Sequence, residues 1–235
     1  ALQVLDELAA LGVRPDRYPI VDLSGTLRAR QQLRLVKYEG LVHWADALPD
    51  RLEGVVIGNE VLDAMPVQLL VRKAGVWHER GVVLQPDGSL GWEDRPTPLR
   101  PPMDIEGEHD YLTEIHPQGE AFIRTLGERM ARGAAFFIDY GFGESEYFHP
   151  QRHMGTLICH RAHQSDDDPL AVVGEKDIPA HVNFTGIALA AQDAGMTVLG
   201  YTGQGRFLIN CGLLDVAKNA DVRESAMLVK LVNEH

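Results

Sequence analysis

The sequence has few cysteines, little positive charge and no long apolar run. Its 235 residues carry 22 lysines and arginines against 34 aspartates and glutamates, which gives a net charge of -12. A surface this acidic repels nucleic-acid phosphates and anionic lipid, so neither nucleic acid nor a membrane is expected as the main partner. No stretch approaches the roughly 20 apolar residues of a membrane helix, and no signal-peptide pattern is visible.

The two cysteines, Cys159 and Cys211, lie far apart and form no CxxC pair. This usage is typical of a reducing compartment and excludes a zinc ribbon. A cluster of histidines precedes three acidic residues at 166–168, but its spacing matches no metal motif, so solvated histidines are favoured and no metal site is predicted. The histidines of this cluster are His149, His153, His160 and His163.

The chain opens inside a helical pattern. Leu2, Leu5, Leu8 and Leu11 repeat at three-residue spacing and Gly12 follows as a helix-ending residue, yet no N-cap precedes them. We therefore expect a helix at the first residues and, before it, a strand and a turn that this sequence does not contain.

Alternating strands and helices follow. Strands are predicted at 18–23, 41–46, 54–60 and 134–141, and helices from residue 26, over 117–133 with Gly133 at the end, and from 184. The strands at 41–46 and 54–60 are apolar throughout, which is typical of buried parallel strands. Two last strands, at 197–203 and 206–213, are separated by too few residues for a crossover helix and predict an antiparallel hairpin. This order describes an α/β fold, a doubly wound and mostly parallel sheet.

A small antiparallel insertion interrupts this sheet. Residues 67–92 alternate between apolar and polar, with turn signals at Ala74-Gly75 and Asp87-Gly88. The proline-rich stretch 95–110 predicts an exposed connection back to the core. We divide the chain into 1–66 and 112–235 as the two parts of the core and 67–111 as insertion and linker, with a long loop at 142–182.

Polar residues follow three predicted strands: Asp22, Asn59-Glu60 and Asp139-Tyr140. Ligands of doubly wound sheets bind at the carboxyl ends of the strands, so these side chains are predicted to share one crevice. Asp22 stands where nucleotide-binding folds use an acid to accept hydrogen bonds from ribose hydroxyls, although capping of the next turn explains its position equally well.

The segment GNEVLDAMP (58–66) carries the densest polar cluster. Asn59, Glu60 and Asp63 can grip an amine or a guanidinium through charge-assisted hydrogen bonds. Capping of a short helix at 61–65 would explain one of these polar residues but not three. The glycine pair at 141–143 lacks the third glycine of a phosphate-binding loop, so no phosphate cradle is expected there.

Taken together, IVDLSGTLRARQ, VVIGNEVLDAMPV, FFIDYG, HPQRHMGTLICH and DIPAHVNFTGIALAAQDAG resemble the MidA family of class I S-adenosylmethionine-dependent methyltransferases. The resemblance covers nearly the whole chain. It implies a Rossmann-like methyltransferase core with S-adenosylmethionine as cofactor. The family's glycine-rich cofactor loop has no counterpart in this sequence, so the chain by itself is expected to bind the cofactor poorly or not at all.

The resemblance also implies roles for individual residues. Asp22 is expected on the cofactor ribose, and Asp139 and the NE-x-x-DA-x-P signature face the methyl group and the substrate. The implied catalytic residues are Glu60, Asn59, Asp63 and Asp139; the implied cofactor residues are Asp22, Ser24, Asp46 and Asn59; the implied substrate residues are Pro66, Tyr140 and His181.

The function implied is methyl transfer to a protein, on an arginine side chain, with a respiratory complex I subunit as the partner in mitochondrial relatives. The alternative is a methyltransferase-like scaffold or assembly factor that works through protein binding, and a nicotinamide-dependent dehydrogenase ranks third. We expect a bacterial cytoplasm, or a mitochondrial matrix if the source is eukaryotic. Homo-oligomerisation is left open.

Overall fold

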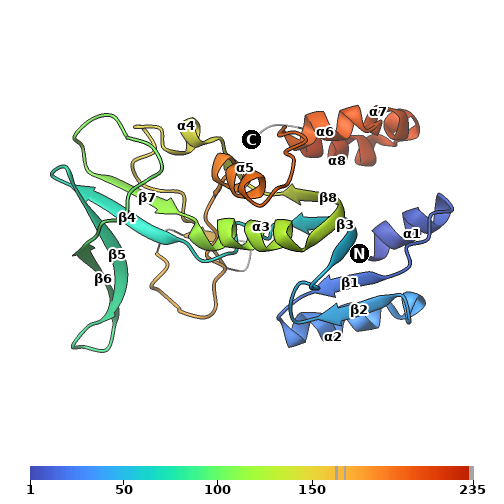
Figure 1. Cartoon of the computed structure of the whole chain (residues 1–235), viewed down its shortest axis with the longest axis horizontal. Coiled ribbons are helices and arrows are strands. Elements are labelled where there is room, and N and C mark those ends of the chain that lie inside the picture. Colours follow the sequence, from blue (N-terminus) through green and yellow to red (C-terminus); the bar gives the residue numbers. More distant parts are fainter. Residues whose placement is uncertain (162–163, 167, 233–235) are drawn as a thin grey trace. The chain divides into compact units, whose positions relative to one another are not determined.

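The structure, a computed structural model, describes residues 1–161, 164–166 and 168–232 (Figure 1). His163 and Asp167 of the histidine and acid cluster lie outside these residues. The chain forms two compact units: unit 1 comprises Ala1–Gly54 with Arg129–Gly133, and unit 2 comprises Val55–Glu128 with Ala134–His235. Strands β3 (Leu52–Asn59) and β8 (Met130–Ile138) pair with each other, and each contributes residues to both units.

Unit 1 is a small βαβ arrangement with one further helix, α1, packed against it. Its elements are α1 (Leu2–Ala10), β1 (Tyr18–Val21), α2 (Gly25–Arg34), the 3-10 helix η1 (Val36–Tyr38) and β2 (Val42–Ala45). β1 and β2 are parallel, as predicted, and Leu5, Leu35 and Val42 form the core beneath them. The predicted first helix is confirmed: it ends before Gly12, whose φ of +70° lets the Val13 N–H donate to the Leu8 carbonyl at 2.8 Å.

Unit 2 contains the predicted antiparallel insertion. Strands β4 (Gln68–Lys73), β5 (Val76–Leu84), β6 (Leu90–Pro96) and β7 (Tyr111–Ile115) form one sheet in the order β6-β5-β4-β7. Both predicted turns are present, with φ of +49° at Ala74 and +84° at Gly88. The fourth strand, β7, follows the proline-rich connection, which thus joins two neighbouring parts of one unit.

A buried arginine anchors that connection. Arg72 on β4 is 7% exposed, and its guanidinium donates to the carbonyls of Ile105 at 2.8 Å and His109 at 3.2 Å. The same guanidinium lies 5.6 Å from the ring centre of Trp77 and 5.8 Å from that of Tyr111. The stretch predicted to be exposed is therefore partly packed, because an arginine on the sheet supplies partners for its carbonyl groups.

As far as α5, the rest of unit 2 follows the predicted order, with one helix shorter than expected and short elements within the predicted loop. The elements are α3 (Pro117–Arg129), β9 (Gly141–Phe142), α4 (Glu144–Tyr147), β10 (Cys159–Arg161), β11 (Gln164–Asp166), β12 (Val182–Asn183) and α5 (Phe184–Asp193). The prediction that Gly133 ends the helix was wrong, because α3 ends at Arg129 and Gly133 lies inside β8. A Cβ at Gly133 would collide with the Gly54 carbonyl, so glycine there permits close approach of two strands.

Strands β2 and β3 were both predicted to be buried throughout, and this was also wrong. In β2, Val42 is buried but His43 is exposed. In β3 the burial is also uneven. Gly58 is buried, whereas Val55 is 67% and Ile57 56% exposed. An apolar run shows that a strand suits a buried sheet, but it does not show how many of its faces are covered.

The predicted C-terminal hairpin is replaced by helices. Residues 197–203 form no strand, and the chain continues as α6 (Gln204–Asn210), α7 (Leu213–Val216), the 3-10 helix η2 (Ala217–Asn219) and α8 (Val222–Val232). Helices α6 and α8 pack side by side in Figure 1. The error arose because a run as short as Phe207–Ile209 fits a strand and a helix equally well. Across the described residues, no helix combines the length and the apolar character that crossing a membrane requires.

Candidate functional site

A sharp turn follows β3 and carries the predicted catalytic residues. Asn59 ends the strand, and Glu60 adopts a φ of +50°, in the left-handed region that residues other than glycine rarely occupy. The Glu60 N–H donates to the Ile138 carbonyl at 2.9 Å, which ties the turn to the end of β8. Both side chains are exposed. Strained backbone of this kind is common at functional sites, and here it turns two polar side chains outward.

The carboxylate of Asp139 holds this turn in place. Its Oδ2 accepts from the backbone N–H groups of Val61 at 3.1 Å, Leu62 at 2.9 Å and Asp63 at 3.4 Å. Its Oδ1 accepts from the Tyr140 N–H at 3.0 Å. Both oxygens of Asp139 are therefore engaged with backbone donors, and the residue positions the turn.

Asp63 is buried beside this carboxylate. The residue is 8% exposed, and among the described residues its Oδ1 has no hydrogen-bond partner. Burial, reinforced by the negative charges of Asp139 and Glu60, raises the pKa of Asp63 to about 6. A buried carboxylate oxygen beside two other acids favours a cationic or N–H-bearing group as its partner.

The raised pKa of Asp63 predicts a pH-dependent stability. In the unfolded chain the pKa is about 3.9, so the folded state binds this proton more tightly and loses stability as the pH rises from about 4 to about 6. The loss is at most about 3 kcal/mol, and solvent screening reduces it. Urea unfolding of the whole protein across this range should show a shallower pH slope in Asp63→Asn than in the wild type. Equal slopes would show that the Asp63 pKa is not raised.

Two further polar residues near the site are buried, and the sequence analysis did not identify them. His116 directly precedes α3 and is 6% exposed, and within the part of the chain that the structure describes neither ring nitrogen has a hydrogen-bond partner. Burial lowers the pKa of His116. Glu114 on β7 is 1% exposed. Both residues lie in a stretch that was assigned to the start of the core. The sequence pattern of an alternating strand does not show whether a single polar residue in or next to it is buried.

The predicted substrate residues lie on neighbouring segments of unit 2. Tyr140 is 62% exposed between β8 and β9, and Pro66 is exposed after the β3 turn. The ring of His181 stacks on that of Phe142 with centroids 5.3 Å apart. The residues on either side of His181 are bound to the site: the Ala180 N–H donates to the Asp63 carbonyl at 3.1 Å, and the Val182 N–H to the Tyr140 carbonyl at 2.8 Å.

The predicted cofactor residues of unit 1 follow its two parallel strands. Asp22 comes directly after β1, and its oxygens accept from the Ser24 N–H at 2.9 Å and from Gln31 at 2.7 Å. Ser24 caps α2. Arg28 joins the two strand ends, because it donates to the carbonyl of Asp22 and pairs with the Asp46 carboxylate at 2.7 Å.

The structure thus brings the predicted residues together in two groups. Asn59, Glu60, Asp63 and Asp139 surround one turn in unit 2, and Asp22 and Asp46 lie at adjacent strand ends in unit 1. That both groups face one crevice stays a prediction.

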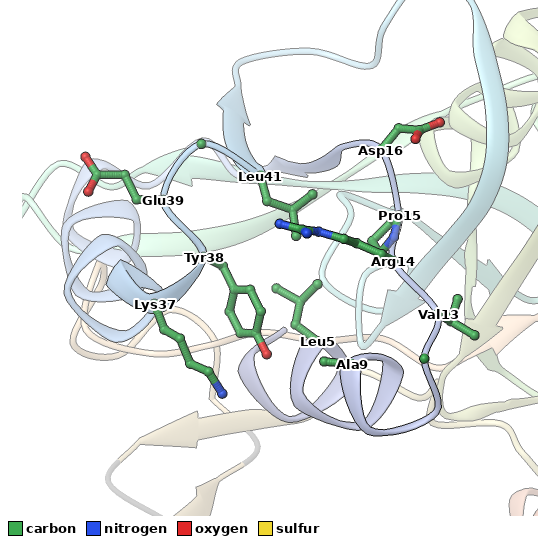
Figure 2. Close-up of a pocket in the computed structure, with 12 residues that line it drawn as sticks. Leu5, Ala9, Val13, Arg14, Pro15, Asp16, Lys37, Tyr38, Glu39 and Leu41 are labelled. Carbon is green, nitrogen blue, oxygen red and sulfur yellow. The ribbon is translucent and has the colours of Figure 1, made fainter.

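A separate cavity of about 770 Å³ lies in unit 1 (Figure 2). Leu5 and Ala9 of α1, the segment 12–16 and the segment 37–41 line it. These loops precede β1 and β2, so the cavity opens at the amino ends of the strands and contains none of the predicted site residues. Ligands of doubly wound sheets bind at the opposite, carboxyl ends, which is why we do not take this cavity as the functional site.

Within the described part of the chain, no group of three or more His, Cys, Asp and Glu side chains is placed to hold a metal ion. The expectation of a metal-free site stays a prediction.

Comparison with known proteins identifies the family. A family model described as "Putative S-adenosyl-L-methionine-dependent methyltransferase" matches residues 1–202. A solved structure from Burkholderia thailandensis, bound to S-adenosyl-homocysteine, is 46% identical with a TM-score of 0.91, and a second from that organism is 47% identical with a TM-score of 0.92. The "Protein arginine methyltransferase NDUFAF7 homolog, mitochondrial" of Caenorhabditis elegans is 26% identical over 209 residues, which is 82% of this chain.

The chain spans 47% of the length of the Caenorhabditis elegans relative. It covers 64% and 66% of the two solved chains, each of which covers 99% of it in return. The Rossmann-like α/β fold class and the resemblance to the MidA family are both confirmed. The chain belongs to the family of S-adenosyl-L-methionine-dependent methyltransferases that this model describes.

Proposed function

We propose that the whole protein transfers a methyl group from S-adenosylmethionine to an arginine side chain of a protein. The observation that carries this proposal is the group of three acids around the β3 turn, where Asp63 Oδ1, beside Asp139 and Glu60, has no hydrogen-bond partner among the described residues. An arginine is always protonated in water, and carboxylates bind its planar guanidinium better than any other side chain. The arginine activity named for the Caenorhabditis elegans relative agrees with this chemistry.

The polar side chains at the strand ends of unit 1 suit the cofactor, because their carboxylates can accept hydrogen bonds. A carboxylate oxygen has two acceptor sites, so Asp22 can accept from ribose hydroxyls while it keeps its bonds to Ser24 and Gln31. The side chain of Asp46 is 87% exposed and can accept from a further donor group. Asp22, Ser24 and Asp46 would hold the nucleoside part, and Asn59 would contact the cofactor at the end of β3. When bound, S-adenosylmethionine supplies the sulfonium methyl group.

The residues of unit 2 would orient the acceptor. Methyl transfer is an in-line displacement, with the attacking nitrogen about 3–3.5 Å from the methyl carbon, so positioning supplies most of the catalysis. Glu60 binds the guanidinium nitrogens that do not react, and Asn59 aligns the group by hydrogen bonding without adding charge. The new N–C bond replaces the C–S bond, whose electron pair stays on sulfur.

Asp63 is the group suited to take the proton that the substituted nitrogen must lose. Its pKa of about 6 keeps it ionised at neutral pH. Because this pKa is closer to neutral pH than that of an ordinary aspartate, Asp63 is the stronger base of the two. The rate of methyl transfer by the whole protein should therefore rise through about pH 6, as the Asp63 proton leaves.

Substitution of Asp22 tests the cofactor part of this proposal. Asp22→Ala in the whole protein should weaken binding of S-adenosylmethionine about 10- to 100-fold, because two charge-assisted hydrogen bonds to the ribose are lost. Isothermal titration calorimetry measures this. Asp16→Ala, which removes an exposed acid at the other end of the same strand, is the matched control and should bind normally. Equal affinity of Asp22→Ala and Asp16→Ala would exclude Asp22 from the cofactor site.

A scaffold function is the second candidate, and one surface favours it. Val82 pairs with Trp92 and Leu84 with Leu90 on one face of the β5–β6 hairpin, and these side chains are 37–73% exposed. Apolar patches of this kind mark protein contacts. The two functions separate by calorimetry: a scaffold without cofactor use gives no heat with S-adenosylmethionine.

The compartment and the partner belong to the proposal as well. The name of the Caenorhabditis elegans relative places that protein in mitochondria. We expect the cytoplasm for a bacterial source and the mitochondrial matrix for a eukaryotic one, with a protein as substrate in both.

A further inference from the structure

The long loop of unit 2 is fastened to a buried carboxylate that the proposed reaction does not use. Glu114 on β7 is 1% exposed, and its carboxylate accepts from the Thr156 N–H at 3.0 and 3.1 Å and from the Thr156 hydroxyl at 3.1 Å. The Tyr147 hydroxyl donates to the same carboxylate at 3.2 Å. Burial raises the pKa of the Glu114 carboxyl group. A buried carboxylate is costly in free energy, which indicates that Glu114 and its hydrogen-bond partners have a role beyond packing.

The loop is shaped to reach this carboxylate. Gly155 has a φ of +75°, and a Cβ there would collide with a carboxylate oxygen of Glu114. Only glycine therefore lets the chain wrap closely enough for the next residue, Thr156, to donate with both its N–H and its hydroxyl. The contact with Glu114 therefore explains why a glycine directly precedes Thr156.

Thr156, held in place by Glu114, in turn contacts His181. Its hydroxyl oxygen accepts from the His181 N–H at 3.0 Å, while its carbonyl lies 3.4 Å from the ring nitrogen Nδ1. A carbonyl can only accept, so Nδ1 must carry the hydrogen for this contact to be attractive. The other ring nitrogen, Nε2, is then a bare acceptor. The stacked ring of Phe142 limits rotation of the imidazole.

We propose that Glu114 and Thr156 are positioning residues that fix His181 as an Nδ1–H tautomer, so that its Nε2 accepts a hydrogen bond from an N–H group of the substrate arginine. His181 is suited to this role because its two neighbours are bound to Asp63 and Tyr140, on the same site. The inference about the substrate rests on the proposed function, whereas the tautomer itself does not.

Nitrogen NMR of the whole protein, labelled with ¹⁵N-histidine and free of substrate, tests the tautomer. The His181 signal should show a protonated Nδ1 and an unprotonated Nε2 at neutral pH. Thr156→Val keeps the carbonyl that faces Nδ1 but removes the hydroxyl that bonds Glu114 and the His181 N–H, so His181 loses its fixed position. The population should then shift toward the Nε2–H form that predominates in water, and Thr156→Ser should restore the Nδ1–H form. A wild-type His181 with a protonated Nε2 would overturn the proposal, whatever the activity of the protein. This wild-type spectrum decides the matter even if the valine variant fails to fold.

Kinetics test the link to the substrate. Thr156→Val should lower kcat/KM for an arginine peptide about tenfold, the equivalent of one hydrogen bond, with unchanged cofactor affinity, and Thr156→Ser should recover most of it. Thr125→Val on α3 is the matched control, because its hydroxyl donates to the Ala121 carbonyl of its own helix. A folded Thr156→Val protein with wild-type kcat/KM would overturn the role of His181. If no arginine is methylated by the wild type, the proposed function fails, and the NMR result still decides the tautomer.

Discussion

Glu60→Gln in the whole protein should reduce the rate of arginine methylation about 100-fold and leave the affinity for S-adenosylmethionine within about twofold of the wild type. The amide keeps the size of the side chain but removes the charge that holds the guanidinium. The left-handed backbone at Glu60 does not change, because glutamine is no larger and the Glu60 N–H still donates to Ile138. The rate is measured by transfer of a labelled methyl group to an arginine peptide.

Glu53→Gln is the control for this prediction. Glu53 lies on the same strand, β3, is exposed and pairs with Arg51 at 2.6 Å. Its neutralisation changes the net charge by the same amount and should leave the rate unchanged. If Glu60→Gln lost cofactor affinity in parallel with rate, Glu60 would belong to the cofactor and not to the substrate.

Asp139→Ala should be the most damaging single substitution at the site. It removes the acceptor of four backbone N–H groups, those of residues 61, 62, 63 and 140, of which the shortest bond is 2.9 Å. Leaving such donors unsatisfied should lower the free energy of unfolding by about 2–4 kcal/mol, and the rate of methyl transfer should fall at least about 100-fold as the turn loosens. Urea unfolding and the transfer assay measure the two effects.

Asp139→Asn separates position from charge. The amide oxygen can still accept from the Val61 and Leu62 N–H groups, so this variant should retain most of the stability that alanine loses. If Asp139→Asn is as inactive as Asp139→Ala while remaining stable, the charge itself takes part in the reaction, which would contradict a purely positioning role.

The sequence was most informative where a pattern was long or a turn was specific. The leucine repeat before Gly12 predicted α1, and the two glycine turns predicted the β4–β5 and β5–β6 hairpins. It failed where a short apolar run had two interpretations, as at Phe207–Ile209, and where a glycine served close strand approach instead of a helix end, as at Gly133. In each failure the deciding contact was distant in the sequence.

The candidate site could be predicted only in part for the same reason. Asn59, Glu60 and Asp63 stand close together in the chain, so their common turn was visible from spacing alone. The role of Asp139 depends on hydrogen bonds to residues 76–78 positions away, and that of Glu114 on residue 156. No local pattern encodes such pairs, and buried carboxylates in particular look like ordinary surface acids in a sequence.

A crystal structure of the whole protein with S-adenosyl-homocysteine and an arginine peptide would show directly whether the Asp22 group and the β3-turn acids serve one reaction centre. We expect the Asp22 carboxylate on the ribose, and the Glu60 carboxylate on the guanidinium whose reacting nitrogen points at the sulfur. A ligand bound away from Asp22, or a β3 turn that faces away from the sulfur, would show that the two acidic groups do not serve one reaction centre.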